Sequence, residues 1–185
     1  GRRTEERVAA SGCGAAGEAG KSKTAVVPQE VNLASASAAS TVKVPPGVAT
    51  ISCDDDRRGT TSQDVLEVSD QIIGQIVSRC QTRGMSMIHL YYSGDTNETL
   101  YQLISSVSSQ AISYGMSILI LDIDSPGGDV EQAMAIGDLV SKNGWAVWVG
   151  SDSQCNSACV FLLASASVRS VGGKVGIHRI FPRSS

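Results

Sequence analysis

From residue 61 onward, apolar and polar residues follow two alternating patterns. In some segments apolar residues recur every three or four positions, which predicts amphipathic helices over 61–83, 95–115 and 129–144. Between them lie short apolar-rich segments, which predict strands over 85–94, 117–124 and 145–150. The segment 117–124 is nearly continuously apolar, which is the pattern of a strand buried on both faces. The order strand, helix, strand, helix, strand implies right-handed crossovers and a largely parallel sheet. The pattern therefore predicts an α/β fold.

Residues at the ends of the three predicted helices support this assignment. The polar pairs that can cap a helix start are Thr61 with Asp64, Asp95 with Glu98, and Asp129 with Gln132. Gly84 and Gly144 follow the first and third helices as stop signals. Gly74 lies inside the first helix and lowers its intrinsic stability by about 1 kcal/mol relative to alanine.

The first 60 residues differ from the rest because small residues and low-complexity sequence dominate them. The sequence therefore predicts a flexible leader over 1–60, an amphipathic helix over 61–84 and a core over 85–185. Two stretches of the leader resemble nucleotide-binding loops, namely the GxGxxG match at 12–17 and Gly20-Lys21-Ser22. Neither follows a strand, as such loops require, so we do not interpret them as binding sites.

The composition narrows the classes of function. The chain has 185 residues, of which 42% are apolar and 18% charged, and a formal net charge of −3. These values are typical of a globular domain, and they argue against a nucleic-acid partner, which would require clustered Lys and Arg. No apolar run approaches the roughly 20 residues that span a bilayer, so membrane association is not evident. The five cysteines form no CxxC pair, and with two histidines they predict no metal site.

Two segments combine features of a catalytic site. The turn SPGG, residues 125–128, follows a buried strand, where ligands gather in α/β sheets, and the Gly128 N–H can face developing negative charge. Ser157 follows the strand at 145–150 and opens an apolar helix, which is a suitable place for a nucleophile. The N–H of Ala158 would be the second oxyanion donor. The alternative is that Ser157 only caps the helix.

A serine hydroxyl needs a base to become a good nucleophile, and His178 in GKVGIHRIF is the candidate. Residues 168–171 and 175–181 are predicted to form two strands around Gly172-Gly173, which could return His178 toward the serine. His89 is the competing base, but no motif supports it, and we expect a structural role for it.

The motifs SPGGDV, CNSAC and GIHRIF occur in this order and resemble the serine peptidases of the ClpP/crotonase fold. The resemblance covers about residues 85–182 and is closest to the bacterial extracytoplasmic branch with a CxSAC segment. It implies a ClpP/crotonase-type fold that hydrolyses peptide or protein substrates. In this family pattern Ser157 is the nucleophile, His178 the general base, and Gly128 and Ala158 the oxyanion donors. It also implies a homo-oligomer, no cofactor and a periplasmic location, although no signal peptide is visible.

The sequence departs from the family pattern in its third catalytic residue. The family's triad acid lies well downstream of the histidine, whereas this chain ends seven residues after His178. We therefore expect a C-terminal truncation and leave the triad acid unassigned. Asp124 and Asp152 are near in sequence, but neither is at the family position. Lys174 is an alternative base that we rank below His178.

Cys155 and Cys159 stand on either side of Ser157, four positions apart. If Cys155 lies just before the helix, their Cα atoms come close to the range of a disulfide. The alternative is two buried thiols that pack as small hydrophobic groups. The extracytoplasmic resemblance favours the disulfide, which would clamp the turn that presents Ser157.

These residues are compatible with three functions. The first is hydrolysis of peptide bonds by Ser157 and His178. The second is a non-catalytic assembly or binding module, because the chain lacks an assigned triad acid. The third is an acyl-CoA enzyme of the crotonase type, which would need the oxyanion donors but neither Ser157 nor His178. We expect the first.

Overall fold

A six-stranded, mostly parallel sheet forms the centre of the computed structural model, which describes residues 42–43, 49–54 and 62–177. The strands lie in the order β3 (Gln63–Asp64), β2 (Ala49–Ser52), β5 (Met87–Ser93), β6 (Ile118–Asp124), β7 (Ala146–Val149) and β9 (Val168–Val171). From β5 to β9 the neighbours are parallel, while β2 and β3 pair antiparallel at one edge. The predicted class, α/β with a mostly parallel sheet and crossover helices, is confirmed.

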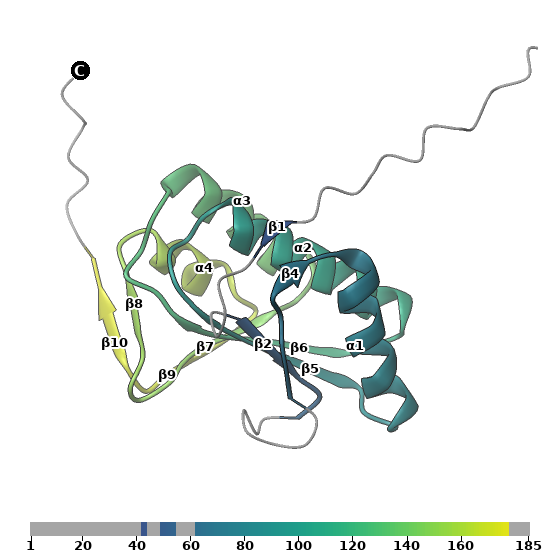
Figure 1. Ribbon diagram of the computed structural model, residues 1–185. Coiled ribbons are helices and arrows are strands. Elements are labelled where there is room, and N and C mark those ends of the chain that lie inside the picture. The colour runs from purple at the N-terminus through teal and green to yellow at the C-terminus, as the bar shows by residue number, and fades with distance from the viewer. Residues whose placement is uncertain (1–41, 44–48, 55–61, 178–185) are drawn as a thin grey trace, which may run out of the picture. The chain divides into compact units, whose positions relative to one another are not determined.

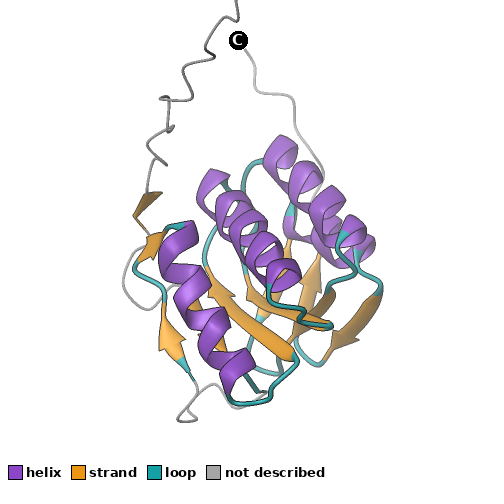
Figure 2. Ribbon diagram, turned by 90° about the vertical axis from the view of Figure 1, so that its right-hand side faces the viewer, coloured by secondary structure: helices purple, strands orange, loops and turns teal. Residues whose placement is uncertain are grey.

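Four helices of the described residues lie together on one side of the sheet (Figures 1 and 2), and the last three of them connect the parallel strands. The four are α1 (Asp70–Thr82), α2 (Glu98–Ser113), α3 (Val130–Lys142) and α4 (Cys159–Ser165). The chain steps from β5 to β6 to β7 to β9 in one direction across the sheet. Right-handed crossovers that all step in one direction place their helices on the same face.

The core lies between this sheet face and the helices. Alternate strand residues point to it, and Ile88, Leu90, Leu121, Ile123 and Val147 are fully buried there. Burial of each such side chain stabilises the fold by about 1.5–3 kcal/mol. The large helix residues that meet them include Ile73, Leu103 and Ile136.

The helix boundaries agree with the sequence in part. Asp129 caps α3 as predicted, because its carboxylate accepts from the Gln132 N–H at 2.9 Å. In α2 the cap is Asn97, which accepts from the Leu100 N–H, and not Asp95. Both helices otherwise occupy the predicted segments.

The start of α1 was predicted wrongly. The helix begins at Asp70, and the residues before it form β3 and β4 (Glu67–Val68). β3 pairs with β2, and β4 pairs with β1 (Val42–Lys43). Val65 and Val68 are buried in this irregular stretch, so their spacing of three positions imitated a helix.

The boundary of the predicted leader at residue 60 is also too late. Residues 49–52 form β2, in which Ile51 is fully buried and pairs with Leu90 of β5. Cys53 follows β2 and forms a disulfide with Cys80 of α1. The core therefore includes residues 49–54. Among the described residues, no helix combines the length and apolar character needed to cross a membrane.

Candidate functional site

Ser157 occupies a strand-to-helix turn with an unusual backbone. The turn follows β8 (Gln154–Asn156) and leads through Ala158 into α4. Ser157 has φ of 53° and is the one non-glycine residue with positive φ in the described part of the chain. The left-handed conformation costs a residue with a β-carbon about 1–2 kcal/mol. Such strained residues gather at functional sites, where the surrounding structure holds them.

Backbone hydrogen bonds hold the turn on both sides. On one side, the Ser125 N–H donates to Gln154 O at 2.7 Å and the Asn156 N–H donates to Ser125 O at 3.0 Å. On the other side β8 pairs in parallel with β10 (Lys174–Gly176), and the Ser157 N–H donates to Gly176 O at 2.7 Å. The turn is therefore fixed between the end of β6 and β10.

A disulfide also spans the turn. It joins Cys155 of β8 to Cys159, the first residue of α4, with a Cα–Cα distance of 5.3 Å. Both cysteines are fully buried. Only three residues, 156–158, lie between them, and Ser157 is the middle one.

The SPGG segment packs directly against Ser157. An ideal Cβ on Gly127 would lie 2.8 Å from Ser157 Cβ and 2.9 Å from Asn156 O, so only a glycine allows this approach. Its φ of 111° also favours glycine. The two segments singled out in the sequence are thus in contact.

Gly128 is positioned by Thr96, a fully buried residue between β5 and α2. The Thr96 N–H donates to Gly127 O and the Asp129 N–H donates to Thr96 O, both at 2.9 Å. These two hydrogen bonds make Thr96 and Gly128 a parallel β-bridge, in which the N–H of Gly128 points away from Thr96. Within the described part of the chain, neither the Gly128 nor the Ala158 N–H donates to a backbone carbonyl. No motif in the sequence points to this role of Thr96.

An apolar cavity of about 220 Å³ opens beside Ser157. Besides Ser157 and Ala158, it is lined by Val130 of α3, by Val160, Phe161 and Ala164 of α4, and by Ile177. Ile177, which follows β10, is 84% exposed. The candidate nucleophile therefore borders a space that suits an apolar side chain.

Other candidate residues either line another hollow or lie outside the described part of the chain. His178 follows Ile177 but lies outside the described residues. Asp124, Asp152 and Lys174 line another hollow, of about 510 Å³. Asp124 there accepts from the Gln154 N–H at 3.0 Å, which fixes the start of β8 to the end of β6.

His89 occupies the opposite face of the sheet from the core residues Ile88 and Leu90, because side chains alternate along β5. It is 1% exposed, lies 3.1 Å from the Tyr91 hydroxyl through Nδ1, and stacks on that ring. This environment agrees with the structural role expected for His89. No group of three or more potential metal ligands occurs among the described residues.

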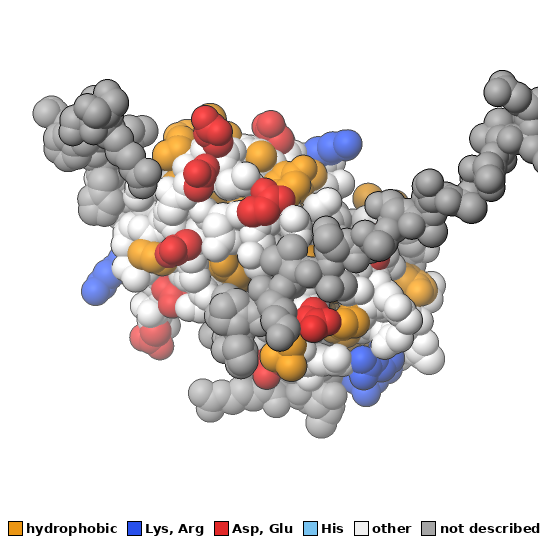
Figure 3. Space-filling view, turned by 45° about the horizontal axis from the view of Figure 1, so that its top comes forward, with side chains coloured by type: hydrophobic (Ala, Val, Ile, Leu, Met, Phe, Trp, Pro, Cys, Tyr) orange, Lys and Arg blue, Asp and Glu red, His pale blue; other side chains and the backbone are white. Residues whose placement is uncertain are grey.

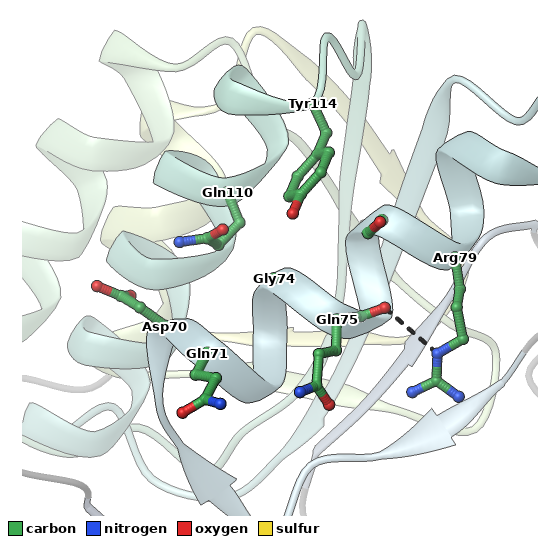
Figure 4. A pocket seen from close by; sticks show the side chains of 8 residues that line it. Asp70, Gln71, Gly74, Gln75, Arg79, Gln110 and Tyr114 are labelled. Atoms are coloured by element: carbon green, nitrogen blue, oxygen red, sulfur yellow. Dashed lines mark hydrogen bonds between the residues drawn. The ribbon is translucent and has the colours of Figure 1, made fainter.

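A larger hollow, of about 540 Å³, lies between α1 and α2 and contains none of the candidate residues (Figure 4). Gln110 of α2 and Tyr114, the residue after that helix, face Gly74 of α1 across it. A Cβ on Gly74 would lie 2.7 Å from Gln110 Oε1, so the glycine allows close helix packing. The hollow is polar and open, and we assign it no function.

Acidic side chains are spread over the helix-bearing side of the molecule (Figure 3). The exposed carboxylates of α2 and α3 include Glu98, Glu131 and Asp138. In this view Lys and Arg side chains lie toward the periphery.

Comparison with known proteins found a partial structural match and no related family. No family model matches the chain. No curated protein matches it. A solved structure that does match is a mutant of the 1510-N membrane-bound stomatin-specific protease, at 16% identity with a TM-score of 0.47. The match covers 51% of this chain and 49% of that one, so it spans about half of each.

Proposed function

We propose that the chain is a ClpP-like serine peptidase in which Ser157 is the nucleophile. The observation that supports this most is the left-handed Ser157 at the start of α4, in contact with the Gly127-Gly128 segment. The ordinary cap role does not account for it, since the cap residue of α4 is Ala158. The strained turn instead places the half-buried serine beside an apolar cavity.

In the proposed reaction Ser157 Oγ attacks the carbonyl carbon of a peptide bond while His178 takes its proton. His178 then returns the proton to the leaving amine, and water hydrolyses the resulting ester. The N–H groups of Gly128 and Ala158 hold the oxyanion, and one such donor can be worth about 10²–10³ in kcat. Ile177, which lines the cavity with Ser157, immediately precedes His178 in the chain.

The cavity supports a preference for substrates with an apolar side chain next to the cleaved bond. Its wall is formed by Val130, Val160, Phe161, Ala164 and Ile177. An acyl-CoA enzyme would use the same oxyanion donors without a serine nucleophile, and an assembly module would use neither. Both alternatives leave the strain at Ser157 unexplained.

Two disulfides, Cys53–Cys80 and Cys155–Cys159, support an oxidising, extracytoplasmic compartment for this chain. The exposed apolar residues Val168 and Val171 of β9, an edge strand among the described residues, support self-association. We include both in the proposal.

The proposal is tested by labelling the chain with a fluorophosphonate probe, which reacts with activated serines. Wild type is compared with Ser157→Ala, His178→Ala and the matched control Ser151→Ala, which removes an exposed serine from the loop before β8. We expect labelling of wild type and of the control, and its loss in the other two variants. Labelling that persists in Ser157→Ala, or an unlabelled wild type, would contradict the proposal.

A further inference from the structure

We propose that the Cys155–Cys159 disulfide is a positioning element that holds Ser157 in its reactive, left-handed conformation. The inference rests on the proposed function for the chemistry of Ser157, and on the structure for the geometry of the turn. It assigns to two buried cysteines a role in catalysis in addition to any contribution to stability.

The first argument concerns distance. Cys155 and Cys159 have Cα atoms 5.3 Å apart. Four residues of extended chain would separate them by about 13 Å. The covalent bond therefore excludes an extended path through residues 156–158 and requires a compact turn. Ser157, in the middle, provides the reversal with its φ of 53°.

The second argument concerns the start of α4. The helix has only seven residues, and its cap residue, Ala158, offers no side-chain hydrogen bond to the free N–H groups. Short helices without caps fray at their ends. Cys159 is the first residue of α4, so its disulfide ties the uncapped end to β8. The N–H of Ala158, the proposed oxyanion donor, lies within this closed loop.

The third argument is that these backbone hydrogen bonds fix the strand that precedes Ser157, and the Ser157 N–H itself, but do not fix the helix that follows. They fix Asn156 to Ser125 and the Ser157 N–H to Gly176. After Ser157, the Val160 N–H of α4 donates to Ser157 O at 3.1 Å, which begins the helix but does not join it to β6, β8 or β10. The disulfide is thus a covalent cross-link between the fixed strand and the helix that follows.

The other disulfide provides a matched control. Cys53–Cys80 joins the end of β2 to α1 and closes a longer loop, with a sequence separation of 27 against 4 for Cys155–Cys159. In the chain-entropy model the longer loop contributes more to stability. Removal of Cys53–Cys80 should therefore lower the stability more, whereas removal of Cys155–Cys159 should lower the reactivity of Ser157 more.

The experiment compares wild type with Cys155→Ala/Cys159→Ala and Cys53→Ala/Cys80→Ala, all below their unfolding midpoints. The rate of fluorophosphonate labelling of Ser157 is measured together with the thermal midpoint. We expect the first variant to label about 10- to 100-fold more slowly, as for a misplaced catalytic group. The second should unfold at a lower temperature than the first but label within about twofold of wild type.

Amide hydrogen exchange at Ser157 separates this inference from the proposed function. The Ser157 N–H is bonded to Gly176 O, so its protection reports the turn whether or not the serine is reactive. Faster exchange in Cys155→Ala/Cys159→Ala, with little change in the control, supports positioning even if the wild type is unlabelled. Unchanged exchange and labelling in that variant would overturn the inference. If alanine prevents folding, Cys155→Val/Cys159→Ala restores lost volume and gives the same test.

Discussion

Replacement of Gly128 by alanine is the sharpest test of how the SPGG segment is held. An ideal Cβ at this position would lie 2.4 Å from Thr96 O and 2.8 Å from Thr96 N. Both are backbone atoms of a fully buried residue, which is fixed by hydrogen bonds to Gly127 and Asp129. The new methyl group therefore cannot be accommodated by a side-chain rotation, and the two segments must separate.

Two contributions set the magnitude for Gly128→Ala. The φ of 152° is one that residues with a β-carbon rarely adopt, at a cost of about 1–3 kcal/mol. Overpacking a buried contact adds about 1–3 kcal/mol. We therefore expect the free energy of unfolding to fall by about 2–6 kcal/mol. Gly144→Ala is the matched control, because Gly144 also has positive φ, 70°, but no heavy atom lies within 4 Å of its Cβ position.

The assay is urea unfolding of wild type and both variants, followed by circular dichroism. Gly144→Ala should lose only the conformational contribution of about 1–2 kcal/mol. A Gly128→Ala variant that is no less stable than Gly144→Ala would refute the close contact with Thr96, and with it the proposed orientation of the Gly128 N–H.

Two further predictions concern the pKa of a buried tyrosine and the apolar cavity. Burial, assisted by the nearby Asp95 charge, raises the pKa of Tyr92 to about 12 from 10.0, so the fold favours the protonated phenol. The contribution of this pKa shift to stability is complete below about pH 10 and is lost as the pH rises toward about 12. In urea unfolding over this range, the free energy of unfolding of Tyr92→Phe should fall less steeply with pH than that of wild type. An equal fall would contradict the assignment. Ala164→Phe should fill the cavity and lower kcat/KM for peptides with a large apolar side chain about 10-fold or more, while fluorophosphonate labelling of Ser157 stays near wild type. Unchanged peptide kinetics would exclude this cavity as a substrate site.

The central fold could be predicted because its strands are rich in apolar residues and are separated by helical patterns. The segments around Leu90, Leu121 and Val147 are such strands, and the polar cap Asp129 marks a helix start. Strands of two residues carry no such pattern, which is why the stretch around Val65 was assigned to a helix. β2 was missed for a similar reason, since it has only four residues and follows a low-complexity stretch of sequence.

The candidate residues could be named from the sequence, but their geometry could not. The motifs identified Ser157 and the glycines at 127 and 128, yet contact between them depends on β8 lying beside the end of β6. The left-handed φ of Ser157 has no sequence signature, because serine rarely adopts it. The pairing of Cys53 with Cys80 was likewise open, since connectivity cannot be derived from cysteine positions alone.

The position of β2 determines where the chain can be shortened. A protein that began at residue 61 would lack β2, and β5 would become a sheet edge with unpaired N–H and C=O groups. Such an edge is a template for pairing with another molecule. The same deletion would leave Cys80 without its disulfide partner. Shortened forms that keep residue 49 onward avoid both liabilities, so β2, which covers β5, sets the minimum length of a domain that resists aggregation.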